Sequence, residues 1–170
     1  NQTFQESRDY NYNLSSFTKR FKGHKIELEI INSFITITPY NIINRFQNLK
    51  ILTIRNSQLT ELNYEYISAL DKLETIDLEE NLIENPDEKL LCLPNLKNLS
   101  YASNKIQKLS QSLIEKLATS NLESLNMLNN PGINALYNIS SDNSTPFKNM
   151  QEVADGLKFE VKIPDAANHM

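Results

Sequence analysis

The stretch LETIDLEENLI, at residues 73–83, decides the fold that we predict for this chain. Leu73, Ile76, Leu78, Asn81 and Ile83 stand at positions 1, 4, 6, 9 and 11 of one unit. Successive side chains of a strand point to opposite faces, so positions 4 and 6 point inward while positions 3, 5 and 7 point outward. The stretch therefore predicts one short strand with a buried apolar edge.

The same template recurs along most of the chain. Units that carry it begin at residues 25, 49, 73, 96 and 122, so their starts are 24, 24, 23 and 26 residues apart. Such a period is typical of arrays that stack one strand per unit into a curved parallel sheet. At position 9, the amides of Asn81, Asn104 and Asn130 are expected to pair with turn backbone, and Ser33 and Ser57 to do so less fully.

The segments between the predicted strands carry apolar residues at helical spacing. Thr38 followed by Pro39 is a typical helix start, and a later segment places Leu113 and Leu117 on one face. We therefore predict short helices on the far side of the sheet.

The repeats divide the chain into three predicted segments, which together form one domain. Residues 1–24 are an N-terminal segment with a capping helix, in which Phe17 and Phe21 share a face and Gly23 ends the helix. Residues 25–145 are the five repeats. Residues 146–170 are a C-terminal cap, made of a helix over 146–154 and a terminal strand within 157–163, and a tail.

The pattern L-x-x-L-x-L-x-x-N-x-L of these units resembles the leucine-rich repeat family, in its subtype with repeats of about 24 residues. The resemblance implies an α/β leucine-rich repeat solenoid. It would form a right-handed arc, with a parallel β-sheet on the concave face and short helices on the convex side. The resemblance also implies that the concave sheet binds other proteins.

The outward positions of the five units are the predicted partner-binding site. Carboxylates surround one guanidinium in the N-terminal half, so we expect a partner protein with a basic or mixed-charge surface. Apolar residues at three outward positions support a contact surface, although lateral packing between strands would also explain Ile31 and Ile51. The alternative is that these positions are merely solvated. The predicted residues are Glu27, Glu29, Ile31, Ile51, Thr53, Arg55, Thr75, Asp77, Glu79, Asn98, Ser100, Ser124, Asn126 and Leu128.

The sequence predicts no catalytic, cofactor or metal site. It contains no G-x-S-x-G or H-E-x-x-H motif, and three glycines could not build a phosphate-binding loop. His24 and His169 lack neighbours at ligand spacing. Cys92 lies among leucines and is expected to be a buried small apolar residue. An enzyme is therefore not expected.

Charge and hydropathy bear on the kind of partner. The net charge is −4 and the isoelectric point is about 5.3, so no nucleic acid is expected. The sequence has no apolar run of 18 residues, so no membrane insertion is expected.

We therefore predict a non-enzymatic protein–protein interaction module, such as an adaptor, a regulator or a bacterial effector. The single cysteine excludes an intramolecular disulfide and favours the cytoplasm, or secretion into a host cell for an effector. One alternative is an extracellular fragment of a secreted or cell-surface leucine-rich repeat receptor. A glycan on the Asn98 sequon would block the concave face, which counts against it. Another alternative is the substrate-recognition part of a larger enzyme. The sequence predicts no oligomeric state.

Overall fold

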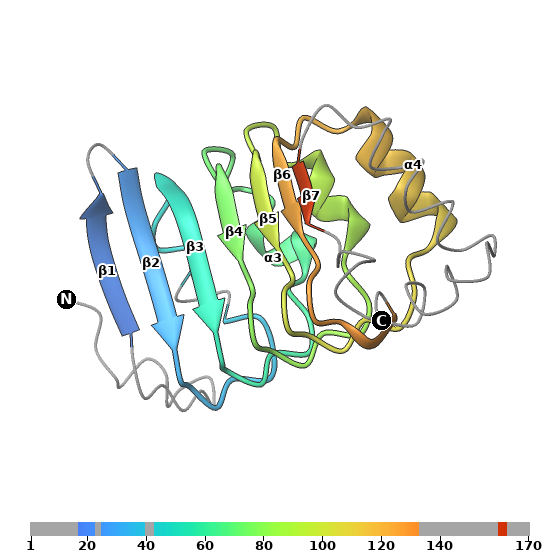
Figure 1. Cartoon of the computed structure of the whole chain (residues 1–170). Coiled ribbons are helices and arrows are strands. Elements are labelled where there is room, and N and C mark those ends of the chain that lie inside the picture. Colours follow the sequence, from blue (N-terminus) through green and yellow to red (C-terminus); the bar gives the residue numbers. More distant parts are fainter. Residues whose placement is uncertain (1–16, 23–24, 40–42, 133–159, 163–170) are drawn as a thin grey trace, which may run out of the picture.

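The structure is a computed structural model that describes residues 17–22, 25–39, 43–132 and 160–162. These residues form a seven-stranded sheet whose strands lie side by side in chain order (Figure 1). β1 pairs with β2 in antiparallel orientation, and every pair from β2 to β7 is parallel. A mostly parallel sheet with few helices is compatible with the predicted α/β class. The strands are β1 (Phe17–Lys22), β2 (Lys25–Ile31), β3 (Leu49–Arg55), β4 (Thr75–Asp77), β5 (Asn98–Ser100), β6 (Ser124–Asn126) and β7 (Glu160–Lys162).

The parallel strands pair in the register that the repeat template predicts. At position 4, Leu28 is opposite Leu52, which is opposite Ile76, and the series continues through Leu99 and Leu125. Positions 3 and 5 pair in the same way. The alignment of the five units is therefore confirmed from β2 to β6.

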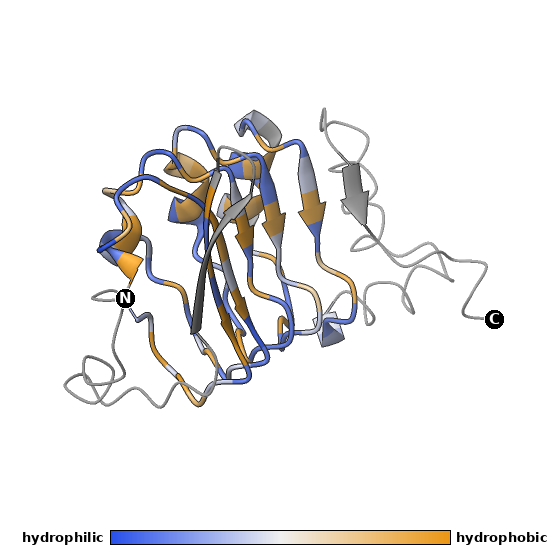
Figure 2. Ribbon diagram, turned by 90° about the vertical axis from the view of Figure 1, so that its left-hand side faces the viewer, coloured by the Kyte–Doolittle hydropathy of each residue, from blue (hydrophilic) through white to orange (hydrophobic). Residues whose placement is uncertain are grey.

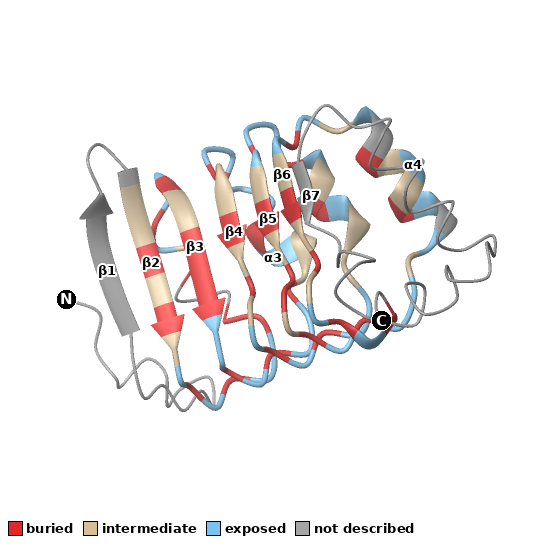
Figure 3. Cartoon of the chain, in the orientation of Figure 1, coloured by how far each residue is buried: buried red, intermediate tan, exposed pale blue. Residues whose placement is uncertain are grey.

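The core lies between the sheet and the segments that connect its strands. Inward side chains such as Leu52, Ile76 and Leu78 are 0% exposed, and they pack against buried residues of the connections, such as Leu90. Figure 3 shows buried positions next to less buried ones along the strands, and Figure 2 shows a hydrophobic residue in the middle of β4, β5 and β6. The helical connections are α3 (Tyr64–Ile67), the 3-10 helix η1 (Glu88–Cys92) and α4 (Gln111–Thr119).

The asparagines at position 9 form the predicted hydrogen-bonded ladder. Asn104 Nδ2 donates to the carbonyl of Leu78 in the preceding unit (2.8 Å) and to two carbonyls of its own unit (3.0 and 3.2 Å). Its Oδ1 accepts from the backbone N–H of Ile83 (3.0 Å). Asn81 and Asn130 also bond to both units in this way.

The serines at position 9 make fewer bonds, as predicted. Ser57 Oγ donates to the carbonyl of Arg55 in its own unit (2.6 Å) and accepts from the backbone N–H of Ser33 (3.3 Å). The side chain is too short to reach several carbonyls, so the ladder is looser at the N-terminal end.

The residue at position 8 of every unit has left-handed backbone, with φ between 48° and 58°. Asparagine tolerates this conformation better than most residues, which explains why it fills three of the five positions. The turn directs the chain out of each strand. The residues are Asn32, Asn56, Glu80, Ser103 and Asn129.

The predicted N-terminal capping helix is wrong, because residues 17–22 form strand β1. The spacing of Phe17 and Phe21 suits a helix, but it also places both residues on one face of a strand. The pairing of Lys22 with Lys25 leaves two residues between β1 and β2, and two-residue connections are typical of β-hairpins. β1 pairs with the backbone N–H and C=O groups at the outer edge of β2. The predicted helix was expected to shield the same edge.

At the C-terminal end, the predicted helix over 146–154 lies outside the described residues. β7 falls within the predicted terminal strand and pairs with β6. The boundaries of the three predicted segments stay predictions.

Gly132 follows the last ladder asparagine at a close approach of two backbones. Its N–H donates to the carbonyl of Ile106 (2.7 Å), and a Cβ added to it would lie 2.0 Å from the carbonyl oxygen of Gln107. Because that neighbour is backbone, Gly132→Ala should force the chain to shift and lower the free energy of unfolding by about 1–3 kcal/mol. Urea denaturation would measure the change, and an unaltered midpoint would contradict the packing described.

Candidate functional site

The open face, which we define as positions 3, 5 and 7 of β2–β6 and their ends, contains all fourteen predicted site residues. Strand alternation places them opposite the buried positions 4 and 6. Twelve are half-buried, as expected for side chains standing on a solvated sheet, and Arg55 is exposed.

Thr53 is the exception to the predicted exposure, because it is 6% exposed. The sheet register places it between Glu29 on β2 and Asp77 on β4. Both neighbours have longer side chains that rise beside the short threonine, which explains its burial. Thr53 therefore offers little surface to a partner.

An ion cluster joins β3 to β4 on the open face. Arg55 Nε donates to Asp77 Oδ2 at 2.9 Å, Nη2 donates to the same oxygen, and Nη2 lies 3.3 Å from Glu79 Oε2. The hydrogen bond to Asp77 is the largest cause of a raised pKa at Arg55, with smaller contributions from the charges of Glu79 and Glu29. The sequence suggested acidic residues around Arg55, and the structure brings these groups into contact.

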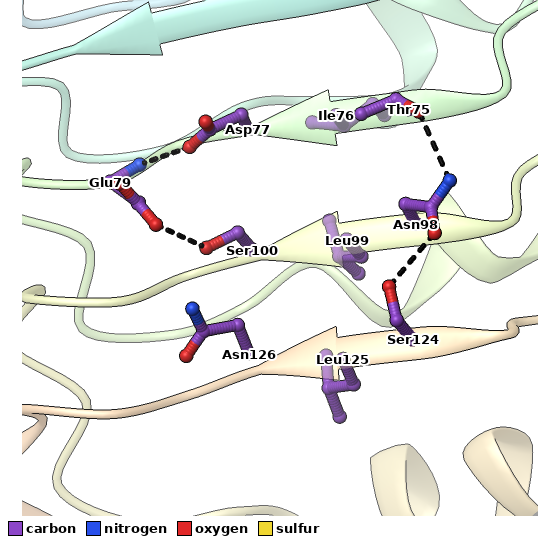
Figure 4. Close-up of a pocket in the computed structure, with 10 residues that line it drawn as sticks. All are labelled: Thr75, Ile76, Asp77, Glu79, Asn98, Leu99, Ser100, Ser124, Leu125 and Asn126. Carbon is purple, nitrogen blue, oxygen red and sulfur yellow. Dashed lines mark hydrogen bonds between the residues drawn. The ribbon is translucent and has the colours of Figure 1, made fainter. Parts of the chain in front are cut away.

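Small polar side chains connect β4, β5 and β6 at position 3. Asn98 Nδ2 donates to Thr75 Oγ1 (3.2 Å), and Ser124 Oγ donates to Asn98 Oδ1 (2.8 Å), as Figure 4 shows. At the other end of the strands, Ser100 Oγ donates to Glu79 Oε1 (3.3 Å). This arrangement fixes the orientation of the short polar side chains.

A hollow of about 300 Å³ lies above these three strands. Its lining combines the carboxylates of Asp77 and Glu79 with the amides of Asn98 and Asn126. The hydroxyls of Thr75, Ser100 and Ser124 complete the polar lining. Seven predicted residues from three units therefore come together around one depression.

The three apolar residues predicted on the open face are half-buried. Ile31 and Ile51 stand on neighbouring strands, and Leu128 follows β6. Partial exposure is consistent both with lateral packing and with contact to a partner.

The prediction for Cys92 is wrong, because its side chain is exposed. η1 is a 3-10 helix, in which residues three apart share a face. Leu90 and Leu93 therefore turn into the core, and Cys92 turns away from it. The leucines around Cys92 predict its burial only if every residue of this segment faces the core.

The residues that the structure describes also bear on metal binding and on membrane insertion. No group of three or more His, Cys, Asp or Glu residues is arranged to hold a metal ion. None of the helices in that part of the chain is long and apolar enough to span a membrane.

Sequence reasoning missed a second hollow, beside the turns that follow β3, β4 and β5. The hollow has a volume of about 440 Å³, and its lining includes Glu61, Leu82, Glu84 and Lys105. Leu82 is 42% exposed. The signal in the sequence is Leu82, a large apolar residue directly after the position-9 asparagine Asn81.

No family model matches the chain. Over 75 residues, or 42% of this chain, the sequence is 37% identical to Podocan-like protein 1 of Homo sapiens. Over the same length it is 39% identical to Podocan-like protein 1 of Mus musculus. The chain spans only 14% of the human relative and 13% of the mouse relative. A leucine-rich repeat relation is consistent with this similarity.

Proposed function

We propose that the chain is a leucine-rich repeat module that binds another protein through the open face. In this proposal the sheet is the concave side of a right-handed solenoid, and α3, η1 and α4 lie on its convex side. The similarity to Podocan-like protein 1, which contains such repeats, supports the proposal. The main observation behind the proposal is the register of the five units. Because equivalent positions lie opposite one another on neighbouring strands, outward side chains that are distant in sequence form one surface.

The charge of the open face defines the proposed partner. Among the predicted site residues, Glu27, Glu29, Asp77 and Glu79 are acidic and Arg55 is basic. A net negative surface attracts a basic or mixed-charge partner and repels an acidic one. The proposed activity is binding without catalysis, and it requires neither cofactor nor nucleic acid.

The relatives support one of the two compartments that the sequence left open. Podocan-like protein 1 is secreted, which favours the extracellular alternative over the cytoplasm. The roles of effector and adaptor have no support from these relatives. Because the match covers a small part of each relative, the activities of the whole relatives are not carried over.

Charge reversal on the open face tests the proposal. The triple variant Arg55→Glu, Asp77→Lys, Glu79→Lys keeps opposite charges next to one another, so we expect nearly unchanged thermal stability. The cluster of residues 55, 77 and 79 changes from a net charge of −1 to +1, so capture of a basic or mixed-charge partner should be lost. The measurement is quantitative mass spectrometry of proteins retained from secreted and cellular extracts by the immobilised chain.

A matched control reverses charges away from the open face. Lys116 Nζ on α4 lies 3.1 Å from Glu88 Oε1 on η1. The variant Glu88→Lys, Lys116→Glu, with Glu84→Lys added, changes the net charge by the same two units as the open-face variant. It should retain the partner. Equal retention by the open-face variant would contradict the proposed binding surface.

A further inference from the structure

The hollow over β4–β6 exists because side-chain size changes along the open face. β2 and β3 present long side chains there, such as Glu29 and Arg55, whereas β5 and β6 present serine and asparagine at positions 3 and 5. The short side chains leave about 300 Å³ of space, the lower end of the range for ligand pockets. The hollow is therefore a place on the open face where one side chain of a docked protein can be buried.

The lining of the hollow excludes anionic and apolar groups. Ile76, Leu99 and Leu125 turn their side chains into the core, so the side chains that border the space are carboxylates, amides and hydroxyls. An anion would meet the carboxylates of Asp77 and Glu79. An apolar group would remove polar atoms from water without pairing them. A cation that donates several hydrogen bonds is the group that fits.

Glu79 connects the hollow to the ion cluster. Its Oε2 lies 3.3 Å from Nη2 of Arg55 on β3. Its Oε1 accepts a hydrogen bond of 3.3 Å from the neutral hydroxyl of Ser100 on β5, as Figure 4 shows. Asp77 and Glu79 carry two negative charges against the single positive charge of Arg55. One further cation beside Oε1 would neutralise the cluster.

We infer that the hollow binds the guanidinium group of an arginine carried by the partner protein, with Glu79 Oε1 as its charged acceptor. This inference rests on the proposed function. The guanidinium has five N–H donors in one plane, and the hollow offers carboxylate, amide and hydroxyl oxygens on three neighbouring strands. A lysine ammonium, with three donors on one atom, would reach fewer of them.

The test is a titration of the ¹⁵N-labelled chain with N-acetyl-arginine N-methylamide. NMR would follow the backbone amide signals of Glu79, Ser100 and Asn126, at which we expect saturable shifts. N-acetyl-citrulline N-methylamide has nearly the same shape but no charge, and it should bind at least tenfold more weakly.

Two charge-removing variants sharpen the titration. Glu79→Gln should weaken binding of the capped arginine at least tenfold, whereas Glu84→Gln removes the same charge outside the hollow and should leave it unchanged. Equal binding of the capped citrulline, undiminished binding to Glu79→Gln, shifts confined to other residues, or no saturable shift would each overturn the inference.

A third variant separates this inference from the proposed function. Ser124→Phe fills the hollow without changing the charge, so it should abolish binding of the capped arginine and reduce capture of the partner at least tenfold. If the open-face charge reversal abolishes capture but Ser124→Phe does not, the open face binds the partner without an arginine in the hollow. That result would overturn this inference and leave the proposed function standing.

Discussion

Leu78→Ala is expected to lower the free energy of unfolding by about 2–5 kcal/mol. Leu78 is 0% exposed and occupies position 6 of the central unit, next in sequence to β4. The equivalent residues of the adjacent units, Ile54 and Tyr101, are also buried. Alanine would leave a cavity with core neighbours on both sides, which the surrounding units can close only partly. Urea denaturation followed by circular dichroism would measure the loss.

Leu82→Ala is the matched control for this prediction. Leu82 belongs to the same unit but is 42% exposed, so its truncation should change the free energy of unfolding by less than about 0.5 kcal/mol. Equal losses in the two variants would show that the inward and outward positions of the unit are assigned wrongly.

Asn104→Ala is expected to lower the free energy of unfolding by about 2–4 kcal/mol. The substitution leaves the N–H of Ile83 without the acceptor described for it, and this N–H lies in the buried ladder. Asn104 donates to three carbonyls. Two of them keep another hydrogen bond in the variant, because Asn81 also donates to Leu78 and Asn130 to Tyr101. The orphaned N–H and the weakened carbonyl bonds therefore account for the loss, which thermal denaturation would also report.

Ser57→Ala provides the comparison at the same position of another unit. Ser57 makes one bond as donor and one as acceptor, so its loss should cost about 1 kcal/mol. If the serine and asparagine variants lose equal stability, the ladder does not hold adjacent units together as described.

The repeat register could be predicted from the sequence because burial and strand alternation act on the same residues in every unit. Inward residues such as Leu52 and Ile76 must be apolar, and the asparagine at position 9 must follow at a fixed distance. A one-residue error would have placed every inward side chain on the wrong face. The fourteen site residues share one face for the same reason, although their contact with a partner stays a prediction.

Features that depend on local geometry could not be predicted in the same way. A spacing of four between Phe17 and Phe21 suits both a helix and a strand, so it did not distinguish the capping helix from β1. Thr53 is buried by its neighbours across the sheet, and Cys92 is exposed by the threefold period of η1. The repeat pattern placed carboxylates near Arg55, but its contact with Glu79 of the next unit depends on side-chain conformations that the pattern does not determine.

The function of the open face is tested most directly by site-specific photo-crosslinking to the captured partner. A photoreactive residue would replace Asn126 on the open face in one variant and Thr119 at the end of α4 in another. The account predicts a covalent adduct with the partner from position 126 and none from position 119. An adduct formed only from position 119 would contradict binding through the open face.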